Sequence, residues 1–246
     1  MVNLRLVAQC GGYQRNITMK PMLSIIIPVL NEGLILEARL RALQFVRAEG
    51  AELIVVDGGS TDDSVRIAEP LCTQLCQSKP GRARQMNQGA ALAQGEYLLF
   101  LHADTVLSKD CLDALLAALA SWPVWGRFDV SIEGAHPLLP LTAAMMNWRA
   151  KWTSVATGDQ GIFIRTERFH EVGGFPDMPL MEDVALSKVL RRVEPPARVR
   201  AQLLTNGRRW DQGGWLRTVL RMWGLRFAYW SGINAQTLAR YYMNVR

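Results

Sequence analysis

Carboxylates and one histidine stand at the ends of three short apolar runs of the sequence: Glu32, Asp57, and His102 with Asp104. The carboxyl ends of parallel strands meet at one edge of a sheet, where open α/β folds bind ligands. On an extended backbone His102 and Asp104, two residues apart, point the same way. Such a pair suits Mg²⁺ or Mn²⁺ that bridges a diphosphate. A metal site is one interpretation, and an Asp104 that caps the next helix is the other.

Asp57 precedes a turn over residues 58–62. Its carboxylate can accept a hydrogen bond from a nucleobase or ribose. It can equally be satisfied by the backbone amides of Gly59 and Ser60, so both roles stay open. Ser60 or Thr61 is well placed to cap the helix that follows.

A basic segment starts the helix that we expect over residues 81–93. Arg82 and Arg84 stand in its first turn, and Asn87 follows one turn later. Guanidinium groups at a helix N-terminus attract phosphate. The alternative is a solvated basic face.

Two further polar groups lie in the second half of the chain. Glu182 and Asp183 begin a predicted helix, where an acid is either a general base or a complement to the helix dipole. Two arginines and a tryptophan follow the last predicted strand. They can clamp a leaving diphosphate and stack on a sugar, or form a surface basic pair beside a core tryptophan. These three residues are Arg208, Arg209 and Trp210.

The elements that must position these groups alternate between strands and helices. Short runs rich in β-branched residues predict buried parallel strands, and the segments between them predict helices on both faces of a sheet. The expected strands are 23–29, 52–57, one near Leu75, 96–102, 125–133, 161–165 and 197–204. The expected helices are 34–47, 81–93, 108–121 with Ser108 as its cap, 138–152, 182–192, 213–233 and a last one capped by Asn234.

The helix over 213–233 has two interpretations. Tryptophans and leucines recur in it near helical spacing, and Arg217, Arg221 and Arg226 interrupt them. It either packs on the catalytic domain with its arginine stems laid along it, or lies on an anionic membrane surface.

Charge and length limit the choice of function. The 246 residues fit one α/β domain with a C-terminal appendage. The net charge is +6, but residues 191–246 hold eleven arginines and two acidic residues, a net charge of +9. Such a segment suits a phosphate-rich partner, which is a nucleoside diphosphate, an anionic membrane or a nucleic acid. Nucleic acid is disfavoured because no strand platform of stacking aromatics accompanies the basic segment.

Several other classes are disfavoured by what the sequence lacks. No glycine-rich dinucleotide or phosphate loop follows a strand, which argues against a dehydrogenase and an ATPase. The four cysteines form no CxxC pair, so we interpret them as reduced thiols of a cytoplasmic protein. No stretch of 18 apolar residues predicts a membrane span. Residues 1–21 lack the apolar core of a signal peptide, and we expect a disordered extension there.

The order of motifs over residues 23–192 resembles that of the family 2 glycosyltransferases, which have a GT-A-type fold. Later motifs are similar to those of a bacterial subgroup of small members without a settled substrate. The matching stretches are Ser24–Pro28 with Asn31 and Glu32, Ile54–Asp57 with Gly59–Asp62, Gly81–Arg84 with Asn87 and Gly89, Leu99–Asp104, Gly158–Gly161, Gly173–Phe175, Pro179–Asp183 and Arg208–Trp210.

The resemblance implies an α/β, mostly parallel twisted sheet flanked by helices, with a Rossmann-like nucleotide-binding half. It implies a UDP- or GDP-linked sugar as donor and Mn²⁺ or Mg²⁺ as cofactor. Asp57 then binds the base, and Asp104 binds the metal and diphosphate. Asp183 beside Glu182 is the catalytic base. The nucleotide pocket is lined by Pro28, Asn31, Glu32, Gly59, Arg82, Arg84 and Asn87, with Asp159 near the donor sugar or the acceptor.

The chain departs from the family pattern at two positions. His102 stands where the first acid of the Asp-x-Asp motif is usual, and Gly58 replaces an acid in the turn after Asp57. The first change puts metal affinity in doubt. It leaves open a non-catalytic protein that binds nucleotide sugars, beside the inverting single displacement that the resemblance implies. A nucleotidyltransferase is disfavoured because no glycine-rich loop with a basic residue follows the first strand.

The expected organisation is an extension over 1–21, a catalytic domain over 22–210 and a helical segment over 211–246. The expected location is cytoplasmic, with contact to a membrane surface if the acceptor is a lipid rather than a saccharide or small molecule.

Overall fold

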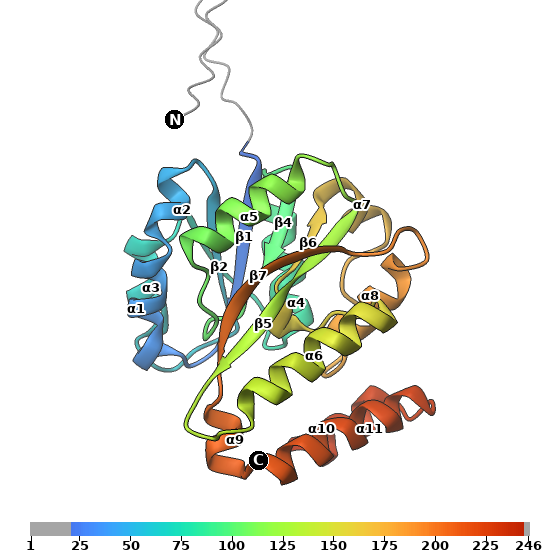
Figure 1. Ribbon diagram of the computed structural model, residues 1–246. Helices are drawn as coiled ribbons and strands as arrows, with labels where there is room; N and C mark the ends of the chain where they lie inside the picture. The colour runs from blue at the N-terminus through green and yellow to red at the C-terminus, as the bar shows by residue number, and fades with distance from the viewer. Residues whose placement is uncertain (1–20, 244–246) are drawn as a thin grey trace, which may run out of the picture.

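A mixed β-sheet forms the centre of the fold. The computed structural model describes residues 21–243, apart from the side chains of Arg209, Gln212 and Met243, so the predicted extension lies almost wholly outside the described residues. Within that range the strands are β1 (Leu23–Val29), β2 (Glu52–Asp57), β3 (Gln74–Gln77), β4 (Tyr97–Phe100), β5 (Trp125–Glu133), β6 (Ile162–Arg165) and β7 (Ala197–Asn206). They pair in the order β3-β2-β1-β4-β6-β5-β7, and only β6 runs antiparallel to its neighbours (Figure 1). The expected mostly parallel sheet is confirmed.

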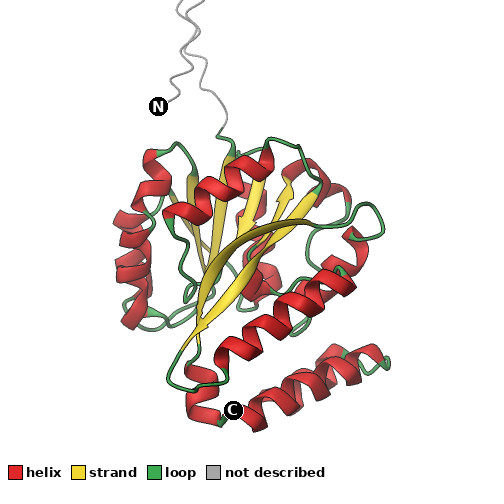
Figure 2. Cartoon of the chain, in the orientation of Figure 1, coloured by secondary structure: helices red, strands yellow, loops and turns green. Residues whose placement is uncertain are grey.

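Helices cover both faces of this sheet, as Figure 2 shows. The alternation of strand side chains explains why: Ile25 and Ile27 of β1 enter one core, and Ile26 enters the other. The first core is completed by α1 (Gly33–Ala42), α2 (Gln44–Ala48), α3 (Ser64–Ala68) and α5 (Lys109–Leu119). The second is completed by α4 (Arg82–Leu92), α7 (Thr166–Glu171) and α8 (Glu182–Leu190).

The remaining helices gather near the carboxyl ends of the parallel strands (Figure 1). They are α6 (Leu139–Thr153), α9 (Arg208–Gly213), α10 (Trp215–Trp230) and α11 (Ala235–Met243). Trp215 Nε1 of α10 donates to Thr142 Oγ1 of α6 at 2.8 Å, and Trp210 of α9 is buried between them and β5. The sequence did not predict α9, and the expected boundary at residue 210 falls inside it.

Several expected boundaries need correction. The helix over 34–47 is two helices that break at the buried Leu43, while Gln44 Nε2 donates to Leu40 and Leu71 carbonyls. Neither Ser60 nor Thr61 caps α3, because Ser60 Oγ instead accepts from the Asn31 amide at 2.9 Å. The caps at Ser108 and Asn234 are confirmed: each side chain accepts from a backbone amide of the helix that follows.

Candidate active site

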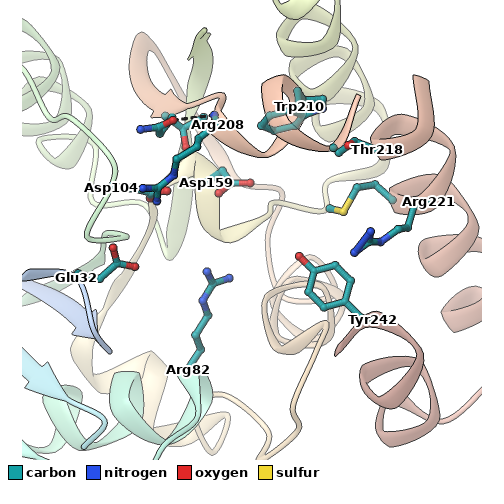
Figure 3. Close-up of a pocket in the computed structure, with 13 residues that line it drawn as sticks. Glu32, Arg82, Asp104, Asp159, Arg208, Trp210, Thr218, Arg221 and Tyr242 are labelled. Atoms are coloured by element: carbon teal, nitrogen blue, oxygen red, sulfur yellow. Dashed lines mark hydrogen bonds between the residues drawn. The ribbon is translucent and has the colours of Figure 1, made fainter. Parts of the chain in front are cut away.

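Two adjoining pockets lie at the carboxyl edge of the sheet. The first, which we call the charged pocket, has a volume of about 320 Å³, and Figure 3 shows its charged side chains around a common space. It is lined by Glu32, Arg82, Asp104, Asp159, Thr205, Asn206, Arg208, Trp210, Gly213, Thr218, Arg221, Met222 and Tyr242. The second, the carboxylate pocket, has a volume of about 260 Å³ and includes His102, Asp159, Glu182 and Asp183.

The loop after β1 is held against the loop after β2. Asn31 adopts φ 55°, and its Oδ1 accepts the Thr61 amide at 2.8 Å. The Gly33 amide donates to Asp62 Oδ2 at 2.9 Å, where the next helix begins. These bonds place Glu32 at the wall of the charged pocket. Asn31 therefore holds the two loops together and does not line the pocket.

Asp57 is buried at the end of β2 and lines neither pocket. Its carboxylate accepts the amides of Gly59 and Ser60, at 2.9 Å and 3.1 Å. The glycine has φ 94°, a conformation that favours a residue without Cβ. In this geometry Asp57 fills the role of a turn aspartate.

His102 and Asp104 are not on an extended segment. Strand β4 ends at Phe100, and the Thr105 amide donates to the His102 carbonyl at 3.0 Å in a turn. The two side chains consequently line different pockets, Asp104 the charged one and His102 the carboxylate one. The premise that both point the same way was wrong.

The imidazole of His102 is held on two sides. Its Nδ1 lies 3.2 Å from Asp159 Oδ1, and Nε2 packs against Gly158, where an added Cβ would lie 2.3 Å from it. Glycine at 158 is therefore required for this contact. Asp159 is one of the residues that line both pockets, so His102 contacts a side chain shared between them.

Glu182 and Asp183 begin α8, directly after a strained residue. Met181 has φ 68°, which is uncommon outside glycine, and it packs among Leu225 and Leu238 of α10 and α11. Asp183 Oδ2 accepts the Gly158 amide and Oδ1 accepts the Val184 amide, each at 2.7 Å. Packing by the C-terminal helices thus holds the segment that presents both carboxylates to the pocket.

The pKa values of both carboxylic acids lie above their ordinary range. Burial raises the pKa of Asp183 although two backbone N–H groups favour its charged form. Burial also raises the pKa of Glu182, and the neighbouring Asp183 raises it further. A carboxylate whose pKa is raised takes up a proton more readily than an ordinary one, as a general base requires.

Arg149 of α6 is a cation that the sequence did not single out as a site residue. Burial lowers its pKa, while Asp183 and Asp159 favour its charged form. Its Nε and Nη2 atoms are buried and meet no hydrogen-bond acceptor among the described residues. It therefore sets a positive field behind the two aspartates.

The C-terminal helices supply pocket residues that the sequence did not identify. Thr218, Arg221 and Met222 come from α10, and Tyr242 comes from α11. Arg221 also lies over the Tyr242 ring at 5.0 Å. The available signal was the set of arginines that interrupts the apolar pattern of residues 213–233, which we interpreted as snorkelling or membrane contact.

The predicted residues divide into those at the pockets and those behind them. Arg84 pairs with Asp177 at 2.8 Å, and the Asn87 side chain bonds to the backbone of Phe175. The pockets are lined by Glu32, Arg82, His102, Asp104, Asp159, Glu182, Asp183, Arg208 and Trp210. Those that line neither are Pro28, Asn31, Asp57, Gly59, Arg84 and Asn87, and the side chain of Arg209 lies outside the described residues.

Trp210 is a core residue with one edge at the charged pocket. It is 7% exposed and packs with Ile132, Leu139 and Ala143. This burial agrees with the interpretation of Trp210 as a core tryptophan.

The charged pocket can be tested for its fit to a divalent cation. Among residues 21–243 no group of three or more His, Cys, Asp or Glu side chains is arranged to hold a metal ion. Mg²⁺ at phosphate sites takes one or two carboxylates and completes its shell with phosphate and water oxygens. Asp104 in a pocket with three arginines fits that arrangement. It does not fit a cage built from protein alone.

A family model decides how this site is classified. The model described as glycosyl transferase family 2 matches residues 24–173, which include the strands and turns that carry Glu32, Asp57 and Asp104. The chain belongs to glycosyl transferase family 2. The matched region ends before α8, so Asp183 and the C-terminal helices lie beyond it.

Curated glycosyltransferases match about two fifths of this chain. A PGL/p-HBAD biosynthesis glycosyltransferase of Mycobacterium tuberculosis is 40% identical over 105 residues, which are 40% of this chain and 41% of the relative. Glycosyltransferase GlyG of Streptococcus pneumoniae is 27% identical over 104 residues, 39% of this chain and 35% of the relative. This chain therefore spans about two fifths of the length of the curated relatives that it matches.

Solved structures share the GT-A fold of family 2. TarS of S. aureus in complex with UDP aligns with a TM-score of 0.61 at 20% identity over 75% of this chain and 60% of that one. A mannosyltransferase of Pyrobaculum calidifontis with GDP-Man and Mn²⁺ gives 0.58 at 21% identity, over 86% and 62%. Glucosyl-3-phosphoglycerate synthase of Mycobacterium tuberculosis, with Mn²⁺ and UDP, gives 0.58 at 19% identity, over 81% and 77%. The expected α/β GT-A fold is confirmed. No helix in the described part of this family 2 chain has the length and hydropathy to cross a membrane.

Proposed function

We propose that this family 2 protein transfers a sugar from a nucleoside-diphosphate sugar to an acceptor hydroxyl, with inversion at the anomeric carbon. One observation carries the proposal: a pocket with three arginines adjoins a pocket with two carboxylic acids of raised pKa. The first suits a departing diphosphate, and the second suits proton transfer from the attacking hydroxyl.

The donor end of the reaction is assigned to the charged pocket. Arg82, Arg208 and Arg221 line it, and guanidinium groups bind phosphate oxygens in pairs. The donor carries UDP or GDP, in line with the structures of TarS with UDP-GlcNAc and of the mannosyltransferase with GDP-Man. Asp57 and the turn behind it shape the base end. Pro28, Asn31, Gly59, Arg84 and Asn87 support the walls from behind.

The cation is assigned to Asp104. A bound Mg²⁺ or Mn²⁺ supplies positive charge to the leaving diphosphate. Asp104 and the diphosphate would both bind this cation. His102 contacts Asp159 and is assigned a positioning role instead of a metal contact.

The role of general base is assigned to Asp183. Its carboxylate takes the proton of the acceptor hydroxyl as that oxygen forms the new bond to the anomeric carbon. The bond from this carbon to the diphosphate breaks on the opposite face, and the electron pair leaves with the diphosphate. Arg82, Arg208 and Arg221 stabilise the charge that leaves. Glu182, next to Asp183, adds a second carboxyl group to the same pocket.

The assigned location is cytoplasmic. Cys72, Cys76 and Cys111 are free thiols, which is usual for proteins in a reducing compartment.

A panel of ligands tests the proposal. Thermal stabilisation is measured with UDP, GDP and their sugar conjugates, each with and without Mn²⁺ or Mg²⁺. We expect one nucleoside diphosphate to stabilise the protein in a metal-dependent way, by about 2.7 kcal/mol at a hundredfold excess over its Kd. Saturable binding without transfer to any acceptor mixture would favour the non-catalytic nucleotide-sugar-binding protein that His102 leaves open. A silent panel with folded protein would overturn both.

A further inference from the structure

Two helices carry stripes of large apolar side chains that face solvent. On α6 the stripe is Leu141, Met145, Trp148 and Trp152, and on α10 it is Leu216, Leu220, Trp223, Phe227 and Trp230. Both follow the spacing of one helix face. Trp148, Trp152 and Trp230 are 65%, 71% and 74% exposed. We call these nine residues together the aromatic face.

The two stripes belong to one surface. Helices α6 and α10 lie side by side in Figure 1, and Met146 of α6 packs in one cluster with Trp215 and Val219 of α10. Each helix buries the side opposite its stripe, through Ala143 and Ala150 on α6 and Thr218 and Leu225 on α10. The stripes therefore both point away from the body of the protein.

The charges around this face have one sign. Helices α6, α10 and α11 contain no acidic residue within their described ranges, and three of their basic residues are exposed: Lys151, Arg217 and Arg240. A second copy of the chain would bring a like-charged surface against this one, which costs free energy. An anionic lipid surface is attracted by it instead. Tryptophan side chains are also enriched where a protein meets the headgroup region of a bilayer.

We propose that the aromatic face is a docking surface for an anionic lipid bilayer. The tryptophans enter the headgroup region, and the arginines that flank them contact lipid phosphates. On its other side α10 lines the charged pocket through Thr218, Arg221 and Met222. Docking therefore holds that pocket within one helix diameter, about 10 Å, of the bilayer surface.

Vesicle flotation with the full chain tests the proposal. We expect binding to vesicles of phosphatidylcholine and phosphatidylglycerol at 3:1 to exceed binding to pure phosphatidylcholine at least tenfold, and to weaken in 0.5 M NaCl because salt screens the arginines. The double variant Trp148→Gln and Trp223→Gln should lose at least tenfold in vesicle binding. The control is Trp122→Gln, which removes a tryptophan that is 49% exposed but lies outside α6 and α10. It should bind vesicles like the unaltered chain.

Folding and ligand binding are followed in parallel. Both variants should keep the unaltered melting temperature, and if Trp122→Gln does not, Leu34→Gln on α1 replaces it, since that side chain is fully exposed. Binding of UDP or GDP should be the same in every variant, so loss of vesicle binding and failure of the proposed function are seen separately. Equal binding by the double variant and the control would overturn the proposal. A concentration-dependent dimer that the double variant dissolves, with no vesicle binding, would assign the face to a second copy of this chain instead.

Discussion

At the residue scale, the site depends on how Asp183 is surrounded. Two backbone amides fix its carboxylate, burial raises its pKa, and Arg149 supplies positive charge from behind. The two amides orient the carboxylate. Burial raises the proton affinity of Asp183, and the positive charge of Arg149 lowers it. A base near neutral pH needs both orientation and a pKa close to the working pH.

Replacement of Asp183 by asparagine separates proton transfer from donor binding. The amide side chain of the variant still offers one oxygen to a backbone amide but cannot take up a proton. We expect Asp183→Asn to lower kcat by 10²-fold to 10⁴-fold, the usual contribution of a general base, while the Kd for nucleoside diphosphate changes little. Steady-state kinetics and calorimetry measure the two quantities. Full turnover in the variant would remove Asp183 from its assigned role.

The acid limb of the pH profile reports the same group. Because the active base is deprotonated, kcat/KM should fall as the pH drops through the raised pKa of Asp183, which lies above the ordinary 3.8. Arg149→Met removes a positive neighbour and should move this limb to higher pH. Lys151→Met, exposed on the same helix, is the matched control and should leave the limb in place. An unmoved limb in Arg149→Met would show that this cation does not act on the base.

At the element scale, the pairing of β5 with β7 is fixed by a buried ion triad. Arg127 Nη1 lies 2.7 Å from Asp129 Oδ1, and Arg198 Nη2 lies 2.6 Å from Asp129 Oδ2. Arg127 is 1% exposed, and the register shifts by a bulge between Phe128 and Asp129. Asp129 thus pairs with both guanidinium groups next to the bulge, and β7 leads on to Arg208, one of the three arginines of the charged pocket.

The triad predicts a stability change for Asp129→Asn. The variant leaves the buried Arg127 without a counter-charge, which costs about 3–5 kcal/mol. Burial opposes ionisation of Asp129, but Arg198 and Arg127 outweigh it and hold its pKa below the ordinary value. Its stabilising contribution is therefore present above about pH 4 and is lost as the pH falls through the lowered pKa. Urea unfolding at pH 7 and at lower pH measures both effects, with the exposed Asp63→Asn as a control that should show no measurable change.

At the scale of the whole molecule, the charged pocket has walls from two parts of the chain. Glu32, Arg82 and Asp104 come from the N-terminal half of the chain, and Arg221 and Tyr242 come from the C-terminal helices. A diphosphate that contacts both walls should hold the C-terminal helices more firmly against the rest of the protein.

Amide hydrogen exchange measures this stabilisation of the C-terminal helices. With saturating nucleoside diphosphate and metal, amides of α9, α10 and α11 should exchange more slowly, because opening of these helices then costs the ligand's binding free energy. The amides of α5, which contributes no residue to the pocket, provide the internal reference. Protection confined to the loops after β1, β2 and β4 would mean that the C-terminal helices do not take part in donor binding.

The sequence predicted the sheet and one wall of the site well, because both follow from local patterns. Buried β-branched runs define β1, β2 and β4, and strand ends place Glu32 and Asp104 at one edge. The orientation of His102 was missed because a turn replaces the expected extended segment. Arg221 and Tyr242 were missed because α10 and α11 reach the pockets through tertiary packing, which no local spacing encodes. Arg149 was missed for the same reason, since only the packing of α6 brings it near Asp183 and Asp159.

Arg82, Asp159, Met222 and Tyr242 line both the charged pocket and the carboxylate pocket. A donor in the first pocket therefore becomes part of the wall that the acceptor meets in the second. The proposed function therefore predicts an order of addition, in which the donor enters first and the acceptor second. The glycosylated product must then leave before the nucleoside diphosphate. We accordingly expect accumulated nucleoside diphosphate to compete with the donor, and a higher acceptor concentration should not relieve this inhibition.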